Sequence, residues 1–229
     1  MGSRSRISYH RVLFRWLIGM ALVTWRYMWQ TTPLHRTEQT VREAPEPPPL
    51  PDDVVDEKVL LAENGRGPLF HRRFRVVIRD AKLDAPALME AVRRDMGDFV
   101  PKEVVGIRHE PARELQVGDE FVVDMPGPWN GPVRVVHTDP HRLRLATLEG
   151  HLEAGQIEFR ARHDGPMLVW EIEAWARPSS RIVNLLYSHF RLAKEVQLNM
   201  WVRFCKRAVV IAGGHGVKGV QVHTDTFRG

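Results

Sequence analysis

A long C-terminal segment with a helical repeat constrains the fold of this chain most. Within residues 179–212, apolar residues recur every three or four positions, the spacing that puts them on one face of an α-helix. Ser179 is a favourable N-cap residue, and Gly213 and Gly214 would end the helix. At 1.5 Å per residue, such a helix would be about 50 Å long. Its apolar face needs an equally broad apolar surface to pack against.

The residues before this helix predict a sheet that supplies that surface. Apolar and polar residues alternate over 157–161 and 168–174, as in strands with one buried face. Glycine and proline punctuate the segments between. We expect a short helix at 84–96, capped by Asp84, and strands at 69–79, 104–109, 120–125, 133–138, 142–148, 155–163 and 167–176. This order predicts an α+β fold in which a curved antiparallel sheet wraps around the long C-terminal helix.

Composition divides the 229 residues into four regions. They are a basic N-terminus with an apolar helix (1–30), a linker rich in proline and acidic residues (31–68), the sheet-and-helix domain (69–212) and a flexible tail with several glycines (213–229). Proline and like charge make a chain extended and semi-rigid. The linker is therefore expected to act as a spacer.

Residues 12–29 predict a membrane-associated helix. They are apolar except for Arg15, Thr24 and Arg26, and as a helix they would extend about 27 Å, close to the hydrocarbon thickness of a bilayer. The segment could span the membrane, lie in its interface or dock as a soluble helix. Arginines before it predict a single-pass protein with a cytoplasmic N-terminus. The side on which the C-terminal domain lies depends on whether the helix spans.

Charge and cysteine content exclude several kinds of site. The net charge is +5, but the outward arginines of the predicted sheet lack the exposed aromatic residues that nucleic-acid binding favours. Cys205 is the only cysteine, so no internal disulfide or zinc site with paired cysteines can form. No metal or other cofactor is predicted.

One stretch carries a more specific signal. Residues 147–155 read Thr-Leu-Glu-Gly-His-Leu-Glu-Ala-Gly, and further matching positions are Phe159, Trp170, Ile172, Ala174, Arg177 and Pro178. This pattern resembles an uncharacterised bacterial and plant family within the helix-grip superfamily, which includes START, polyketide-cyclase and pollen-allergen-like (SRPBCC) domains. The chain departs from the family pattern at Gln156 and Ile157, where paired glutamates are usual, and at Ala176, where serine is usual.

The resemblance implies a cavity between the sheet and the C-terminal helix that takes a hydrophobic small molecule or a lipid. Apolar pockets with few polar groups are also the common form of ligand site. The same apolar residues could instead simply fill the core. Candidate lining residues are Phe121, Val123, Val135, Leu145, Phe159, Trp170, Ile172, His189, Phe190 and Met200.

Within the motif, Glu149, His151 and Glu153 follow one another at every second position. On an extended strand all three side chains would point the same way, where they could bind a metal or exchange protons. Gly150 and Gly155 favour a bend instead, in which His151 hydrogen-bonds the backbone. We favour this structural role, with ligand contact and catalysis as alternatives.

These observations predict a membrane-tethered helix-grip domain that binds a hydrophobic small molecule or lipid, and they favour non-covalent binding over an enzymatic role. One alternative is a cyclase- or hydrolase-like enzyme that uses His151 with Glu149 or Glu153. The other is an interaction module whose basic sheet face, with Arg160 and Arg162, binds an acidic partner.

Overall fold

The computed structural model describes residues 34–43, 46–100, 106–108, 113–124, 130–180 and 191–227. Within them the α-helices are α2 (Ala85–Arg94) and α4 (Arg191–Ala212), and 3-10 turns occur at η1 (Asp52–Val54), η2 (Ala62–Asn64) and η3 (Met96–Asp98). The strands are β1 (Leu34–Val41), β2 (Leu69–Arg79), β3 (Gly106–Arg108), β4 (Glu120–Asp124), β5 (Asn130–Asp139), β6 (Arg142–Thr147), β7 (Glu153–Asp164), β8 (Met167–Pro178) and β9 (His215–Phe227).

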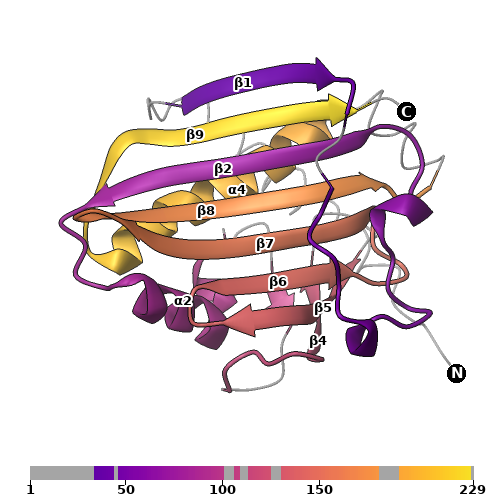
Figure 1. Ribbon diagram of the computed structural model, residues 1–229, viewed down its shortest axis with the longest axis horizontal. Helices are drawn as coiled ribbons and strands as arrows, with labels where there is room; N and C mark the ends of the chain where they lie inside the picture. The colour runs from indigo at the N-terminus through magenta and orange to yellow at the C-terminus, as the bar shows by residue number, and fades with distance from the viewer. Residues whose placement is uncertain are drawn as a thin grey trace, which may run out of the picture.

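All the described strands belong to one sheet. Their order is β1-β9-β2-β8-β7-β6-β5-β4-β3, and every neighbouring pair is antiparallel except β1 and β9. Helix α4 lies along one face of the sheet and contacts β2, β8 and β9 (Figure 1). We call this face the inner face and the opposite one the outer face. The arrangement fits the predicted α+β helix-grip fold.

The main core lies between the inner face and the helices. Alternate residues of each strand point inward, so Phe74 of β2, Phe159 of β7 and Trp170 of β8 are fully buried. Phe204 of α4 stacks on Trp170, with ring centroids 5.8 Å apart and planes inclined by 8°. Burial of these large aromatic side chains contributes much of the apolar stabilisation of the fold.

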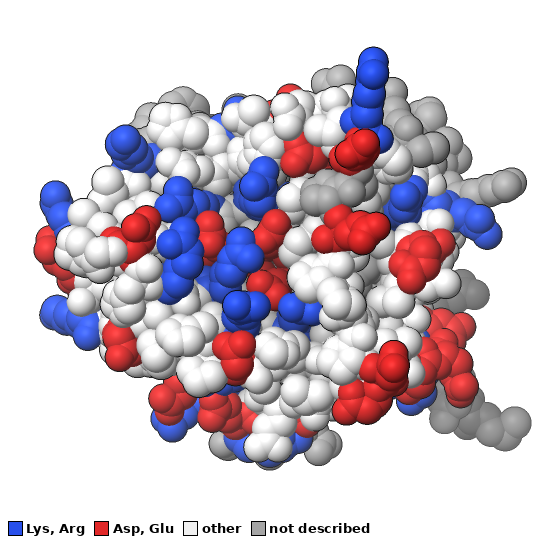
Figure 2. All heavy atoms as spheres, viewed as in Figure 1, with Lys and Arg blue, Asp and Glu red and all other residues white. Residues whose placement is uncertain are grey.

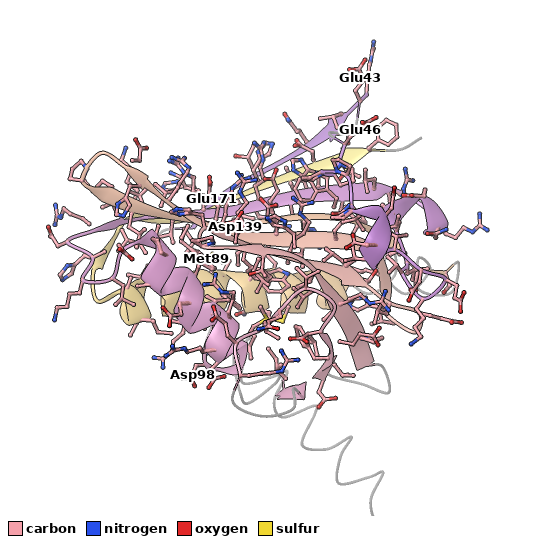
Figure 3. The ribbon with its side chains drawn as sticks, turned by 60° about the horizontal axis from the view of Figure 1, so that its bottom comes forward. Glu43, Glu46, Met89, Asp98, Asp139 and Glu171 are labelled. Atoms are coloured by element: carbon pink, nitrogen blue, oxygen red, sulfur yellow. The ribbon has the colours of Figure 1, made fainter. Side chains whose placement is uncertain are left out.

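The predicted short helix is confirmed as α2. Asp84 is its N-cap, and the Asp84 carboxylate accepts a hydrogen bond from the backbone N–H of Ala87 at 2.9 Å. Proline is tolerated in the first turn because those N–H groups have no partner within the helix. Leu88 and Met89 are fully buried, and in Figure 3 Met89 points from α2 toward the sheet.

The predicted spacer is wrong for the described part of the linker, because it packs on the domain. Residues 34–41 form β1, and residues 46–66, which we call the strap, cross the outer face (Figure 1). The strap joins a second apolar cluster, separate from the main core: Val54, Val59, Val136, Ala146 and Leu148. Apolar burial outweighs the stiffness of the prolines here, so the strap is part of the folded unit.

The predicted flexible tail is also wrong for the described residues. Residues 215–227 form β9, which pairs with β1 on one side and with β2 on the other. Val220 and Val222 of β9 are buried against the core. The alternation around them is a strand signal that the neighbouring glycines obscure.

The prediction of a single-pass membrane protein is contradicted. No helix in the described residues is long and apolar enough to cross a bilayer. The 22 residues of α4 include charged residues from its first turn to its last third, so an unbroken apolar span does not form. Residues 12–29, on which the predicted anchor and membrane contact fall, lie outside the described residues.

Candidate functional site

A cavity of about 80 Å³ lies between the inner face and α4. Its wall is mostly apolar and comes from β3 to β8, from α4 and from the segment around η3. The apolar lining residues include Met96, Val100, Ile107, Val123, Val133, Leu145, Phe159, Met200, Trp201 and Phe204. Its polar end is formed by Thr147, His151, Glu153 and Gly155 of the motif and by the neighbouring Gln156, whose side-chain amide donates to the carbonyl of Pro48 in the strap. The cavity therefore has a long apolar wall and one polar end.

A turn between β6 and β7 positions His151 at this polar end. The backbone N–H of Glu153 donates to Nδ1 of His151 at 2.9 Å. With Nδ1 as an acceptor, the neutral ring must carry its proton on Nε2. Burial lowers the pKa of His151, although the negative charge of Glu153 acts in the opposite direction. The ring is therefore neutral at physiological pH, with Nε2–H as its remaining hydrogen-bond donor.

The strap holds the base of this turn. The carbonyl of Leu60 accepts hydrogen bonds from the Thr147 hydroxyl at 2.7 Å and from the Gly155 N–H at 2.9 Å. A side chain at Gly155 is impossible, since its Cβ would lie 1.9 Å from the carbonyl oxygen of Trp175. The glycine and threonine of the motif therefore set the path of the turn.

Glu153 and Arg72 form a buried ion pair beside His151. Nη1 of Arg72 lies 3.9 Å from Oε1 of Glu153, and both side chains are about nine-tenths buried or more. The Arg72 guanidinium also lies over the Phe70 ring, 4.9 Å from its centroid. Arg72 occupies an inward position of β2, where an apolar residue is usual. The pair keeps the charge of the Glu153 carboxylate compensated inside the protein.

The structure places the predicted lining residues in different surroundings. Leu145, Phe159 and Met200 line the cavity, as does Val123. Val135, Trp170 and Ile172 are fully buried in the surrounding core but are not part of the cavity wall. Phe121 is buried beneath a separate polar depression next to Arg93 and Met96. His189 and Phe190 lie outside the described residues.

The three polar candidates of the motif, Glu149, His151 and Glu153, do not all lie together in the structure. Gly150 has a positive φ of 93°, which turns the chain after Glu149. Glu149 is exposed, whereas His151 and Glu153 line the cavity. The common direction expected for an extended strand is therefore wrong, and the predicted bend with a backbone hydrogen bond to His151 is observed. In the described part of the chain, no three His, Cys, Asp or Glu residues are placed to hold a metal ion.

Sequence reasoning missed several lining residues. Met96 and Val100 follow α2, and Trp201 lies beside Met200 on α4. The available signal for Arg72 is that a charged residue stands at an apolar position of β2, because a charged residue at an inward strand position needs a buried partner.

The outer face carries an ionic network in place of apolar residues. Arg160 donates to Glu171 at 3.1 Å and pairs with Glu173 at 2.8 Å, and Arg162 lies 3.5 Å from Glu171. In Figure 2 basic and acidic side chains are interleaved on this face, and Figure 3 shows Glu171 on the side of the sheet away from α4. The expected basic face is therefore wrong, because carboxylates from the same strands neutralise its arginines.

A broader depression of about 340 Å³ lies over this network. Its lining includes the charged residues Arg73, Arg75, Arg160, Glu171 and Glu173 together with His35 and His223. Opposite charges within it pair with one another, and it lacks the continuous apolar wall of the inner cavity. We therefore take the smaller inner cavity, which contains the motif, as the candidate site.

The fold and the cavity together define a sheet-and-helix domain with a small interior site. The family described as "Domain of unknown function (DUF1990)" matches residues 55–207, about two-thirds of the chain. The protein belongs to this family. The match begins within the strap and includes the whole turn from β6 to β7, so this turn and residues 55–66 of the strap lie inside the family's domain. No curated protein sequence matches the chain significantly.

Several solved structures are similar at low sequence identity. A hypothetical protein from Helicobacter pylori is 14% identical, with 61% of this chain and 87% of that chain covered and a TM-score of 0.45. The di-domain ARO/CYC StfQ from the steffimycin biosynthetic pathway is 11% identical, with 66% and 52% covered and a TM-score of 0.47. Norcoclaurine synthase from Thalictrum flavum, solved with a transition-state analogue, is 12% identical, with 62% and 96% covered and a TM-score of 0.43. These values are too low to transfer a function.

Proposed function

We propose that the protein binds a small, mainly apolar molecule without covalent chemistry, in the cavity between the inner face and α4. The observation that carries this proposal is the contrast between the wall and the end of the cavity. Phe159, Met200 and Phe204 belong to the apolar wall, and His151 and Glu153 to the polar end. Sites for small molecules typically combine an apolar wall with a few polar groups that orient the ligand.

The volume of the cavity restricts the ligand. A cavity of about 80 Å³ is smaller than the roughly 300–1,000 Å³ of typical ligand pockets. It suits a group of a few heavy atoms and is too small for a lipid chain. Met96 and Met200 line it, and the flexible methionine side chain adapts readily to different shapes. We therefore propose a small molecule, or one end of a larger one, in preference to a lipid.

The chemistry of the polar end favours binding over catalysis. Nδ1 of His151 accepts a backbone hydrogen bond, so it cannot take a proton from a substrate while the turn is intact. The Glu153 carboxylate is paired with Arg72. The group left for a ligand is the Nε2–H of a neutral imidazole, which is a good hydrogen-bond donor and a poor acid.

Xenon provides a size-matched test of this proposal. Small dry apolar cavities bind xenon, so we expect xenon under pressure to shift the ¹³C-methyl NMR signals of Met96 and Met200 in a saturable manner. The expected effect is confined to these two methionines and spares Met89, which is fully buried but does not line the cavity.

A filled variant controls for non-specific xenon contacts. Ala174 lines the cavity, so Ala174→Leu should abolish the xenon shifts. The matched control is Ala91→Leu, which adds the same volume on α2 at a partly buried position away from the cavity. Equal shifts in all three proteins, or none in the wild type, would refute the proposed binding site.

A further inference from the structure

The polar end of the cavity contains one hydrogen-bond donor without a described partner. Nδ1 of His151 is occupied by the Glu153 N–H, the residue is partly exposed, and none of the hydrogen bonds between described residues involves Nε2. Among the motif side chains, the Thr147 hydroxyl donates to the Leu60 carbonyl and accepts from the Gly155 N–H, and the Glu153 carboxylate lies beside Arg72. The motif therefore presents the Nε2–H of His151 as a side-chain donor beside an apolar wall.

We infer that the ligand is an uncharged molecule with an apolar body and one acceptor oxygen, such as a ketone, aldehyde or ether, and that this oxygen accepts a hydrogen bond from Nε2 of His151. The inference rests on the proposed function and adds the chemical class of the ligand. A donor at one end of an apolar cavity selects for an acceptor, because a ligand that displaces water from this donor and offers no acceptor leaves the N–H without a hydrogen bond, at a cost in free energy.

Charge at the site excludes ionised ligands. The Glu153 carboxylate lines the cavity and would repel an anion, and its pairing with Arg72 leaves no uncompensated negative charge to hold a cation. The neutral state of His151 supplies no compensating charge, since burial lowers its pKa. An ion would also lose its hydration among apolar residues such as Val133 and Leu145, at a large cost in free energy.

A matched pair of probes tests the predicted oxygen. Cyclobutanone and methylenecyclobutane have the same ring, with C=O in one and C=CH₂ in the other. The methyl signals of Met96 and Met200 report occupancy of the cavity by either probe. The ¹⁵N shift of Nε2 of His151 reports the hydrogen bond, and we expect it to change with cyclobutanone alone.

Two substitutions distinguish the role of Nδ1 of His151, as a hydrogen-bond acceptor, from that of Nε2, as a donor. In His151→Asn the side-chain oxygen can replace Nδ1 as the acceptor for the Glu153 N–H, but the donor no longer reaches the position of Nε2. In His151→Gln the amide reaches that position, but the local acceptor is lost. Because one neutral hydrogen bond changes affinity about three- to tenfold, His151→Asn should reduce the preference for ketone over hydrocarbon by that factor. His151→Gln should retain the preference within about twofold, with a lower melting temperature.

The outcomes distinguish this inference from the proposed function. If neither probe shifts the signals of Met96 and Met200, the proposed function fails. If both probes shift them but Nε2 of His151 does not respond and His151→Asn keeps the ketone preference, the inference is overturned and the binding site stands. Tighter binding of cyclobutanecarboxylate than of cyclobutanone would overturn the assignment to uncharged ligands.

Discussion

The two faces of the sheet bury side chains of opposite character. The inner face buries aromatic side chains such as Phe159 and Trp170 against α4. The outer face buries ion pairs such as Arg144 and Glu158, whose side chains are 8% and 3% exposed. Both faces come from the same strands, because successive residues of a strand point to opposite sides. One set of strands thus carries an apolar layer and an ionic layer.

The comparison shows why the cavity lies on the inner face. Apolar side chains pack without fixed directions, so irregular shapes at the sheet–helix interface can leave a small void. Ion pairs demand close and directional contact, and on the outer face the backbone of the strap completes them. Arg144 donates to the carbonyl of Pro49, and Gln156 donates to that of Pro48. The outer layer is therefore held by hydrogen bonds, whereas the inner layer depends on shape.

Truncation on the inner face should have the largest effect. Phe159→Ala removes a fully buried ring that contacts Trp170, Trp201 and Phe204, with centroids 5.2 to 6.4 Å away. We expect a loss of about 3–5 kcal/mol in the free energy of unfolding, measured by urea denaturation. Because the lost volume adds to the existing cavity, xenon should bind this variant more strongly than the wild type. A loss below about 1 kcal/mol would contradict the tight inner packing described here.

Breaking an outer ion pair should lower the free energy of unfolding slightly less than the inner truncation does. A second substitution that removes the remaining charge should restore the lost stability. Nε and Nη2 of Arg144 both donate to Oε2 of Glu158, at 3.0 and 2.9 Å. Arg144→Met leaves the Glu158 carboxylate buried, with Arg160 as its remaining partner at 3.4 Å, so we expect a loss of about 3 kcal/mol.

The double variant Arg144→Met/Glu158→Leu sharpens the contrast between the faces. It replaces both charges by apolar groups, and such replacements are often neutral or stabilising. We expect it to regain most of the lost unfolding free energy in the same urea measurement. Failure to regain stability would mean that the hydrogen bond from Arg144 to Pro49 holds the strap, which would make the strap the main support of this face.

Acid should destabilise the two faces in different pH ranges. We expect this loss of unfolding free energy to be smaller than the losses from the inner and outer substitutions above. Burial lowers the pKa of His151 from its ordinary value of 6.5, so the folded state favours the neutral ring and stability falls as the pH drops below about 6.5. Burial alone would raise the pKa of Glu173, but the hydrogen bond from His71 and the charge of Arg160 outweigh it, and the pKa is lowered. This carboxyl stabilises the fold above its ordinary pKa and loses that contribution only in stronger acid.

Difference profiles of unfolding free energy against pH test this assignment. The difference in unfolding free energy between the wild type and His151→Asn should begin to change as the pH falls below about 6.5. The difference in unfolding free energy between the wild type and Glu173→Gln should change only below about pH 4.5, which is the ordinary pKa of this carboxyl group. Coincident profiles for the two variants would show that the faces do not titrate separately.

Much of the fold follows from patterns that are local in the chain. Alternation identifies β2 and β4 to β8, and Asp84 with Pro86 identifies the start of α2. The glycines of the motif also predict a bend at His151, because Gly150 needs a positive φ and Gly155 meets the backbone of β8. Each of these features depends on a few neighbouring residues, and for that reason local propensity is sufficient to find it.

The residues that line the cavity cannot be predicted from local sequence patterns. Alternation correctly turns Val135, Leu145, Phe159 and Trp170 inward, but it cannot tell which of them faces a void. Leu145 and Phe159 line the cavity, and the other two are covered by neighbouring side chains. Edge strands are similarly non-local, since β1 and β9 pair in parallel although 173 or more residues separate the two strands.

The amino-acid sequence alone determines which side of each strand is apolar, where the turn of the motif bends and where α2 begins, because these depend on contacts between near neighbours. The tertiary structure decides that Arg72 meets Glu153, that the strap completes the outer ionic layer and that His151 borders an 80 Å³ space. Each of these results requires segments far apart in the chain to come together. A cavity is the space that their packing leaves unfilled, and its position is therefore a property of the assembled fold.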